Sequence, residues 1–214
     1  MSPSVCVESD SVVNPALIMI PDISGFTEYM NNADLSHSQV RIASLLESIL
    51  ESNVLEFDVS EIEGDAILFY SLNNTSNPID VIEQCELMFT NFHNKLREFE
   101  VLDCQCGSCQ KLQELSLKFI VHWGMLGSVM VRDYCKLYGR DLIIAHRLLK
   151  NNLKSNEYIL MTNDFVNHYM RKDMKDHFEN HEWNQGTYDI PNIGELAFHF
   201  KILNSLTASI SNKT

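Results

Sequence analysis

Short β-type segments alternate with longer amphipathic helices along the chain, and this order limits the fold more than any other feature. Residues 16–20 form an apolar run closed by Pro21, too short for a helix and typical of a strand buried on both faces. Residues 24–53 then carry apolar side chains at spacings of three and four, which predicts two consecutive helices. A buried strand followed by helices is expected in a layered domain, where helices cover a sheet.

The rest of the chain continues this alternation. Runs at 54–62 and 65–72 flank Glu63-Gly64 and predict a tight hairpin. Runs at 115–122 and 128–131, separated at Gly124, predict a second hairpin. The other predicted elements are a long helix that follows Pro78 and ends near Val101, a short helix at 140–150, a strand at 158–161, a helix at 164–172 and a closing strand at 195–203.

The composition is that of an ordinary globular domain. Hydrophobic residues make up 45% of the 214 residues and charged residues 21%, which disfavours both disorder and a fibrous structure. Since no linker or internal repeat divides the chain, we expect one α+β domain over residues 16–203, with a mainly antiparallel sheet and helices packed on it. Residues 1–15 are expected to form a flexible N-terminal segment and residues 204–214 a flexible tail.

The net charge is strongly negative. The chain has 16 Lys and Arg against 29 Asp and Glu, a formal charge of −13, which disfavours nucleic acid or a membrane surface as a partner. A nucleotide remains compatible with this charge, because a bound divalent cation supplies positive charge locally. The N-terminal residues lack the pattern of a signal peptide and no run reaches the length of a membrane span, so a cytoplasmic protein is expected.

Two aspartates follow predicted strand ends or turns. Asp22 comes directly after the first strand, and Asp65 follows the turn Glu63-Gly64. If the hairpin lies beside the first strand, both carboxylates meet at one end of the sheet, where oxygen ligands suit Mg²⁺ or Mn²⁺. The alternative is that Asp22 caps the following helix and that Asp65 is a turn residue.

Short motifs surround these residues in a fixed order. They are Pro-Asp-Ile-Ser-Gly-Phe-Thr at 21–27, Glu-Gly-Asp-Ala-Ile-Leu-Phe at 63–69, Val-His-Trp-Gly at 121–124, and Gly139 followed by Ala-His-Arg-Leu at 145–148. By these motifs the chain resembles the catalytic domain of class III nucleotidyl cyclases over residues 16–203. It is even more similar to a small uncharacterised family of bacterial cyclase-like proteins, which resembles it in Ser-Glu-Ile-Glu-Gly-Asp at 60–65 and in a cysteine cluster.

The resemblance implies a ferredoxin-like class III cyclase fold and a metal-dependent reaction. In such enzymes residues at the positions of Asp22, Ile23 and Asp65 hold two Mg²⁺ or Mn²⁺ ions per site. The ribose 3′-oxygen of a nucleoside triphosphate attacks the α-phosphorus, which gives a 3′,5′-cyclic nucleotide and pyrophosphate. The resemblance also implies a head-to-tail homodimer with active sites built across the interface.

Arg147 stands where the family has an arginine that stabilises the phosphates in the transition state. Glu61 and Lys136 stand at the base-recognition positions, although an ordinary surface ion pair is an alternative interpretation. Guanylyl cyclases also have Glu at the position of Glu61, whereas Asp or Cys is expected in place of Lys136. The base, whether A, G, C or U, is therefore left open.

Two expected contacts are missing. Ile143 occupies the position of an asparagine that orients the ribose, and an apolar side chain cannot make that hydrogen bond. Residues 190–195 contain no basic residue where the family has a phosphate-binding lysine. Two functions therefore stay open, a soluble homodimeric cyclase and a cyclase-like domain that binds metal and nucleotide without turnover.

The loop at 101–114 is rich in cysteine. Cys104, Cys106 and Cys109 lie close together there, and such thiolates with one further ligand form a structural zinc site. Reduced or reactive thiols are the alternative interpretation. The candidates for a fourth ligand are Cys85, His93 and a residue of the partner chain.

Overall fold

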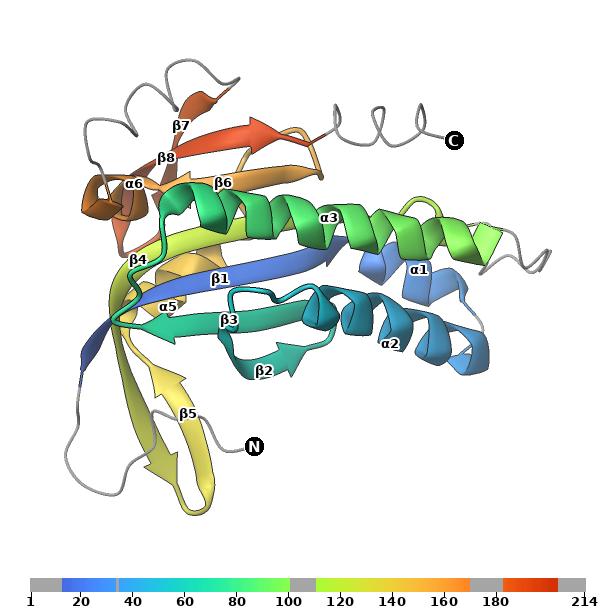
Figure 1. Cartoon of the computed structure of the whole chain (residues 1–214), viewed down its shortest axis with the longest axis horizontal. Helices are drawn as coiled ribbons and strands as arrows, with labels where there is room; N and C mark the ends of the chain where they lie inside the picture. Colours follow the sequence, from blue (N-terminus) through green and yellow to red (C-terminus); the bar gives the residue numbers. More distant parts are fainter. Residues whose placement is uncertain (1–12, 34, 101–110, 170–182, 204–214) are drawn as a thin grey trace.

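Strand β1 (Asn14–Ser24) lies in the middle of the sheet (Figure 1). Its middle residues are buried on both faces. It pairs antiparallel with β3 (Ala66–Leu72) on one side and with β4 (Ser116–Val131) on the other. This computed structural model describes residues 13–33, 35–100, 111–169 and 183–203. The predicted buried strand is confirmed, and it already includes Asn14 and Pro15 from the segment expected to be flexible. The rest of that segment, and the predicted tail 204–214, lie outside the described residues.

The strands form one sheet in the order β2-β3-β1-β4-β6-β8-β7, and β5 pairs with β4. Every pairing is antiparallel except that of β4 with β6, which is parallel. The predicted α+β class with a mainly antiparallel sheet is therefore confirmed. The remaining strands are β2 (Asp58–Glu63), β5 (Tyr134–Tyr138), β6 (Tyr158–Thr162), β7 (Asn184–Ile190) and β8 (Gly194–Ile202).

Helices cover both faces of the sheet (Figure 1). One face packs against α1 (Phe26–Asn32), α2 (Leu35–Glu51), α3 (Pro78–Glu100) and α6 (Asn163–Tyr169), and the other packs against α5 (Arg140–Leu148). Since side chains alternate along a strand, Leu17 and Met19 enter the first core and Ile18 and Ile20 the second. The two helices predicted within 24–53 and the long helix after Pro78 are confirmed.

The predicted second hairpin is wrong at Gly124. The strand continues through this residue, and β4 runs unbroken to Val131 before the chain turns into β5. Gly124 is a glycine for another reason, since a Cβ built there would lie 2.3 Å from Cγ of Asp141. A glycine within a strand here marks a close approach to a side chain and not a turn.

Strands β5 and β7 were not predicted. Strand β7 pairs only with β8, at the edge of the sheet, and its sequence Asn-Gln-Gly-Thr-Tyr-Asp-Ile is largely exposed. Strand β5 has a single buried residue, Leu137. Neither segment carries the apolar run or the clean alternation from which a strand is recognised.

Asp141 fixes α5 to the sheet. Its Oδ2 accepts a hydrogen bond of 2.6 Å from the backbone N–H of Met125, and its Oδ1 lies 3.6 Å from Nε2 of the buried His122. The contact with His122 and the N–H of Met125 hold the pKa of Asp141 below its usual range. The Nδ1 atom of His122 lies 2.8 Å from Oγ1 of Thr162 on β6. His122 is thus a packing residue, and it links the sheet to the helix that carries Arg147.

Substitution of Gly124 by alanine tests this attachment. We expect Gly124→Ala to lower the free energy of unfolding by about 2 kcal/mol, because the added methyl group displaces Asp141 from Met125. Urea denaturation measures the change. Gly127→Ala is the matched control in the same strand, since its Cβ would meet Tyr138 O at an ordinary 3.5 Å. Equal stability of the two variants would contradict the role given to Asp141.

Candidate functional site

Asp22 and Asp65 lie together at one end of the central strands. Asp22 is near the end of β1, in register with Ala66 at the start of β3. Asp65 immediately precedes β3, after Gly64, whose φ of 65° closes the turn from β2. The backbone N–H of Ile23 donates a 3.0 Å hydrogen bond to the carbonyl oxygen of Asp65, which ties the turn to β1. The two aspartates therefore lie at the same end of the sheet, as expected if the hairpin lies beside the first strand.

The two carboxylates line a cleft of about 390 Å³. Burial, and then the negative charge of Asp22, raise the pKa of Asp65 to about 6, and the nearby Lys118 only partly opposes this. The folded chain thus holds two like charges in a partly desolvated place. The repulsion between the two carboxylates destabilises the folded state unless a proton or a cation binds to them.

Lys118 is a member of the site that the sequence analysis missed. It lies on β4 in register with Asp22, and its Nζ is 3.0 Å from Oδ2 of Asp22. Both side chains are largely buried, at 16% and 15% exposure, so the ion pair is only weakly screened by solvent. A signal was present, because Lys118 is the one charged residue within the apolar run 115–122.

The donor set fits a divalent cation bound together with a substrate. Asp22 and Asp65 offer carboxylate oxygens, and Ile23 has only a backbone carbonyl to offer. Among the residues that the structure describes, no three His, Cys, Asp or Glu side chains gather to hold a metal. Phosphate oxygens and water would therefore have to complete the coordination of any ion held here, as is usual for Mg²⁺.

Arg147 lies on α5 and lines a second cleft, next to the first. This cleft is also lined by Asp22 and Lys118, so Asp22 is the predicted metal-site residue that shares a cleft with Arg147. On the same helix, Ile143 is 53% exposed. The structure therefore places an apolar side chain on the surface at the position where the family has its ribose-orienting asparagine.

Glu61 and Lys136 form an ion pair. The Nζ atom of Lys136 on β5 is 2.8 Å from Oε2 of Glu61 on β2, and the side chains are 59% and 26% exposed. The hydrogen bond and charge of Glu61 raise the pKa of Lys136. The two predicted base-recognition residues are thus in contact, while their role with a base stays a prediction.

The zinc prediction concerns residues outside the described part of the chain, since Cys104, Cys106 and Cys109 all fall within 101–110. It stays a prediction. The proposed fourth ligands have other surroundings. Cys85 is fully buried with its sulfur 3.7 Å from that of Met19, and burial raises the pKa of its thiol. His93 is paired with Glu157, Nε2 to Oε1 at 3.1 Å.

Comparison with solved structures identifies the fold as that of nucleotide cyclase domains. The chain is similar to the guanylyl cyclase Cya2, with a TM-score of 0.67 and 11% identity over 90% of this chain and 93% of that one. The adenylyl cyclase CyaB from P. aeruginosa gives a TM-score of 0.65 and 10% identity over 90% and 96% of the two chains. A bacterial light-regulated adenylyl cyclase gives 0.65 and 11%, over 91% of this chain and 53% of that one. The fold implied by the motifs is confirmed.

The chain belongs to the family described as protein of unknown function DUF2652, which matches residues 42–158. A relative from Mycobacterium tuberculosis, the uncharacterised protein Rv2561/Rv2562, is 28% identical over 160 residues, or 74% of this chain and 72% of the relative. None of the helices in the described ranges has the length and apolarity to cross a bilayer.

The raised pKa of Asp65 predicts how stability depends on pH. Between pH about 4 and 6 the folded chain retains a proton that the unfolded chain releases, so this group lowers the free energy of unfolding as pH rises through that window. We expect Asp65→Asn to stabilise the metal-free protein at pH 7.5 by about 1 kcal/mol, after allowance for solvent screening, and to have no such effect at pH 4.

Urea denaturation across this pH range measures the effect. Asp22→Asn is the matched control and should give no gain, because it removes the partner of Lys118. A difference between Asp65→Asn and the parent protein that does not change with pH would contradict the raised pKa of Asp65.

Proposed function

We propose that this protein is a class III nucleotidyl cyclase-like enzyme, which converts a nucleoside triphosphate into a 3′,5′-cyclic nucleotide and pyrophosphate with Mg²⁺ or Mn²⁺. The observation that carries the proposal is the pair Asp22 and Asp65 in one cleft, with the pKa of Asp65 raised by burial and by Asp22. The pair stands at the end of the central strands in a fold shared with adenylyl and guanylyl cyclase domains.

Each of the proposed site residues has its own role in the reaction. Asp22 and Asp65, with the carbonyl of Ile23, would hold the divalent cations, which when bound neutralise phosphate charge and make the 3′-hydroxyl more acidic. The bond from O3′ to the α-phosphorus forms, the bond from that phosphorus to pyrophosphate breaks, and the hydroxyl proton passes to water. Arg147 would stabilise the negative charge on the phosphates as these bonds change.

Recognition of the base is assigned to Glu61 and Lys136. Glu61 offers a carboxylate that accepts hydrogen bonds, and Lys136 offers an ammonium group that donates them. Their mutual contact is exposed enough to be exchanged for contacts with a ligand. The proposal leaves the identity of the base open.

A second candidate function is binding of metal and nucleotide without turnover. Ile143 favours it, because its exposed apolar side chain offers no hydrogen bond to a ribose. The turn between β7 and β8 favours it too, since residues 190–195 include no cation. Each such contact typically accounts for about 2 to 4 kcal/mol of transition-state stabilisation, so their joint loss slows the reaction by orders of magnitude unless other groups compensate.

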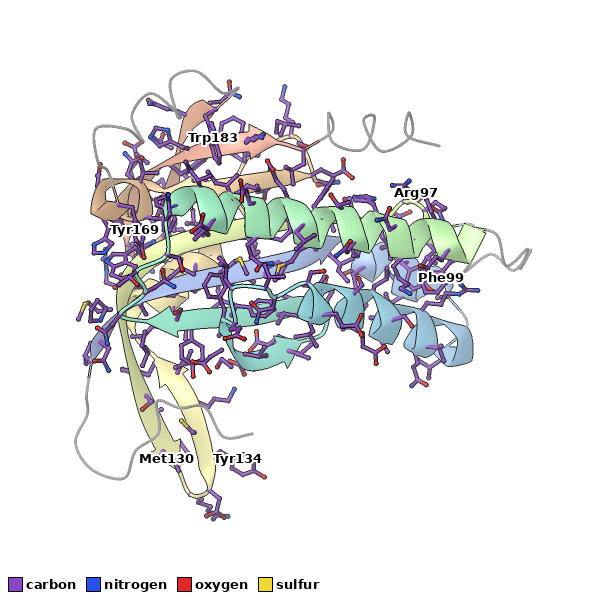
Figure 2. The ribbon with its side chains drawn as sticks, in the orientation of Figure 1. Arg97, Phe99, Met130, Tyr134, Tyr169 and Trp183 are labelled. Atoms are coloured by element: carbon purple, nitrogen blue, oxygen red, sulfur yellow. The ribbon has the colours of Figure 1, made fainter. Side chains whose placement is uncertain are left out.

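A homodimer is part of the proposal, and the β4–β5 hairpin supports it. The hairpin projects from the sheet, with Met130 and Tyr134 near its tip (Figure 2). Met130 is 52% exposed, Tyr134 74% and Tyr138 69%, a concentration of apolar surface that is typical of an interface. Because Lys136 of this hairpin contacts Glu61, the apolar surface adjoins the face expected to meet the partner.

Removal of either aspartate tests the metal site. We expect Mg²⁺ or Mn²⁺ with a nucleoside triphosphate to raise the melting temperature of the parent protein, and neither Asp22→Ala nor Asp65→Ala to show that rise. Mass spectrometry after incubation with each ribonucleoside triphosphate measures cyclic product, which both substitutions should abolish. Asp189→Ala, an exposed aspartate on β7, is the control.

The outcomes separate the two functions. Binding without product in the parent protein supports the second candidate, and a gain of product in Ile143→Asn would then identify the missing contact. Both candidate functions are wrong if metal and nucleotide leave the melting temperature of the parent protein unchanged and no binding is detected at millimolar ligand.

Charge introduced at the hairpin tip tests the dimer. We expect the parent protein to be a dimer at tens of micromolar and the double variant Met130→Glu, Tyr134→Glu to be a monomer, because two carboxylates would have to be desolvated in the interface. Light scattering measures the mass. Val54→Glu, at a residue 64% exposed in the turn between α2 and β2, is the control. A parent protein that is monomeric under these conditions would contradict the homodimer.

A further inference from the structure

Cys135 on β5 is disulfide-bonded, which distinguishes it from the other cysteine in the described part of the chain. That other cysteine, Cys85, is free and fully buried in the core. The partner of Cys135 is therefore one of the four remaining cysteines of the sequence, which are Cys6, Cys104, Cys106 and Cys109. The described residues that flank these cysteines decide which of them can reach Cys135.

The cysteine cluster at 104–109 is attached to the far end of the sheet. Lys111, which follows it, has its Nζ 3.0 Å from Oε1 of Glu28 on α1. The β4–β5 hairpin leaves the sheet at the end opposite α1 (Figure 1). The pairing of β4 with β1 runs from Ser116 to Leu126, which separates the two ends of the sheet by about 33 Å at the usual rise of a strand.

This separation excludes the cluster as the partner within one chain. Cys106 is the member farthest from a described residue, five residues before Lys111. A fully extended chain covers at most about 18 Å over that length. The cluster therefore cannot span the sheet to Cys135.

Cys6 is within reach. The described chain begins at Val13, whose Cγ2 would lie 3.6 Å from a Cβ built on Gly127. Gly127 is in register with Tyr138, three residues from Cys135 along β5. That part of the strand measures about 10 Å, whereas the seven residues from Cys6 to Val13 extend over up to about 25 Å.

The alternation of side chains along β5 separates Cys135 from the proposed base-recognition pair. Cys135 shares a face of the strand with Leu137, which is buried in the second core. Lys136 is on the other face, where it contacts Glu61. A bond at Cys135 therefore does not compete with that ion pair.

We propose that Cys135 and Cys6 of the same chain form a reversible disulfide, which joins the segment before β1 to the β4–β5 hairpin and restrains the hairpin. Within the described ranges β5 pairs with β4 and with no other strand, so a covalent link to the segment before β1 limits its movement. This redox modification does not depend on cyclase activity.

The bond forms by two thiol–disulfide exchanges with a small disulfide such as oxidised glutathione. The thiolate of one cysteine attacks it, which gives a mixed disulfide and releases one glutathione thiolate. The thiolate of the second cysteine attacks the protein sulfur of the mixed disulfide, which closes the protein disulfide and releases the second glutathione. The two cysteine protons pass to the released glutathione, and reduced glutathione reverses both steps. In a compartment that keeps thiols reduced, such a bond is transient.

Peptide mapping of the full chain locates the bond. Cleavage after Lys and Arg places Cys6 in residues 1–41, Cys135 in 133–136 and the cysteine cluster in 98–111, so each pairing gives a different linked peptide. After equilibration with oxidised glutathione and blocking of free thiols with N-ethylmaleimide, we expect 1–41 linked to 133–136. Excess reduced glutathione should remove the link.

Two variants and a second measurement test the restraint. Cys6→Ser should abolish the link, and Cys104→Ser, the matched control, should retain it. We expect the amides of β5 to exchange hydrogen several-fold faster in the reduced parent protein and in Cys6→Ser than in the oxidised parent. The amides of β7, at the opposite edge region of the sheet, should not change.

Three results would overturn the proposal. A link between 133–136 and 98–111, or a covalent dimer on a non-reducing gel that Cys135→Ser removes, excludes the pairing within one chain. Cys135 that stays free or carries glutathione in the oxidising buffer excludes the bond. Equal hydrogen exchange of β5 in the oxidised and reduced protein excludes the restraint.

Discussion

The antiparallel pairing of β1 with β4 determines the position of every other part of the site. Its register runs from Asn14 opposite Leu126 to Ser24 opposite Ser116, and it places Asp22 beside Lys118. The other edge of β1 pairs with β3 and brings in Asp65. A shift of this register by one residue would move Asp22 to the opposite face and bury its carboxylate under α3. The alternation that places Leu17 and Ile18 in different cores therefore also determines the face of the sheet on which the carboxylate of Asp22 lies.

The site is electrostatically unsatisfied, in contrast to the well-packed cores around it. Asp22 and Asp65 repel each other, with Lys118 as partial compensation. In most of a protein, local preferences, packing and electrostatics all favour the same fold, and unfavourable interactions of this kind are concentrated at functional sites. The cost of the conflict is met by the β1–β3–β4 pairing, together with the ion pair of Lys118 and Asp22. A cation bound between the two carboxylates would relieve their repulsion and so stabilise the folded state.

The sequence predicted the fold, and the proximity of Asp22 and Asp65, for reasons that can be identified. Residues 16–20 and the long helix after Pro78 carry strong hydrophobic patterns, and Asp22, Asp65 and Arg147 lie inside motifs. Strand β7 could not be predicted, because an exposed edge strand needs no apolar residues and obtains its order from pairing with β8. Lys118 was missed because the role of a charged residue in a buried strand depends on the residue across the pairing. Gly124 was taken for a turn, since its sequence context does not reveal that Asp141 needs the space of a side chain.

The hydrogen bond from Met125 to Asp141 has a mechanical consequence. Met125 lies where β4 is about to exchange one neighbour for another, since pairing with β1 ends at Leu126 and pairing with β5 begins at Gly127. Met125, at the base of the projecting hairpin, is therefore the residue that is hydrogen-bonded to Asp141 at the start of α5. A displacement of the hairpin would therefore reach α5 first through this hydrogen bond, and Arg147 lies near the other end of that helix.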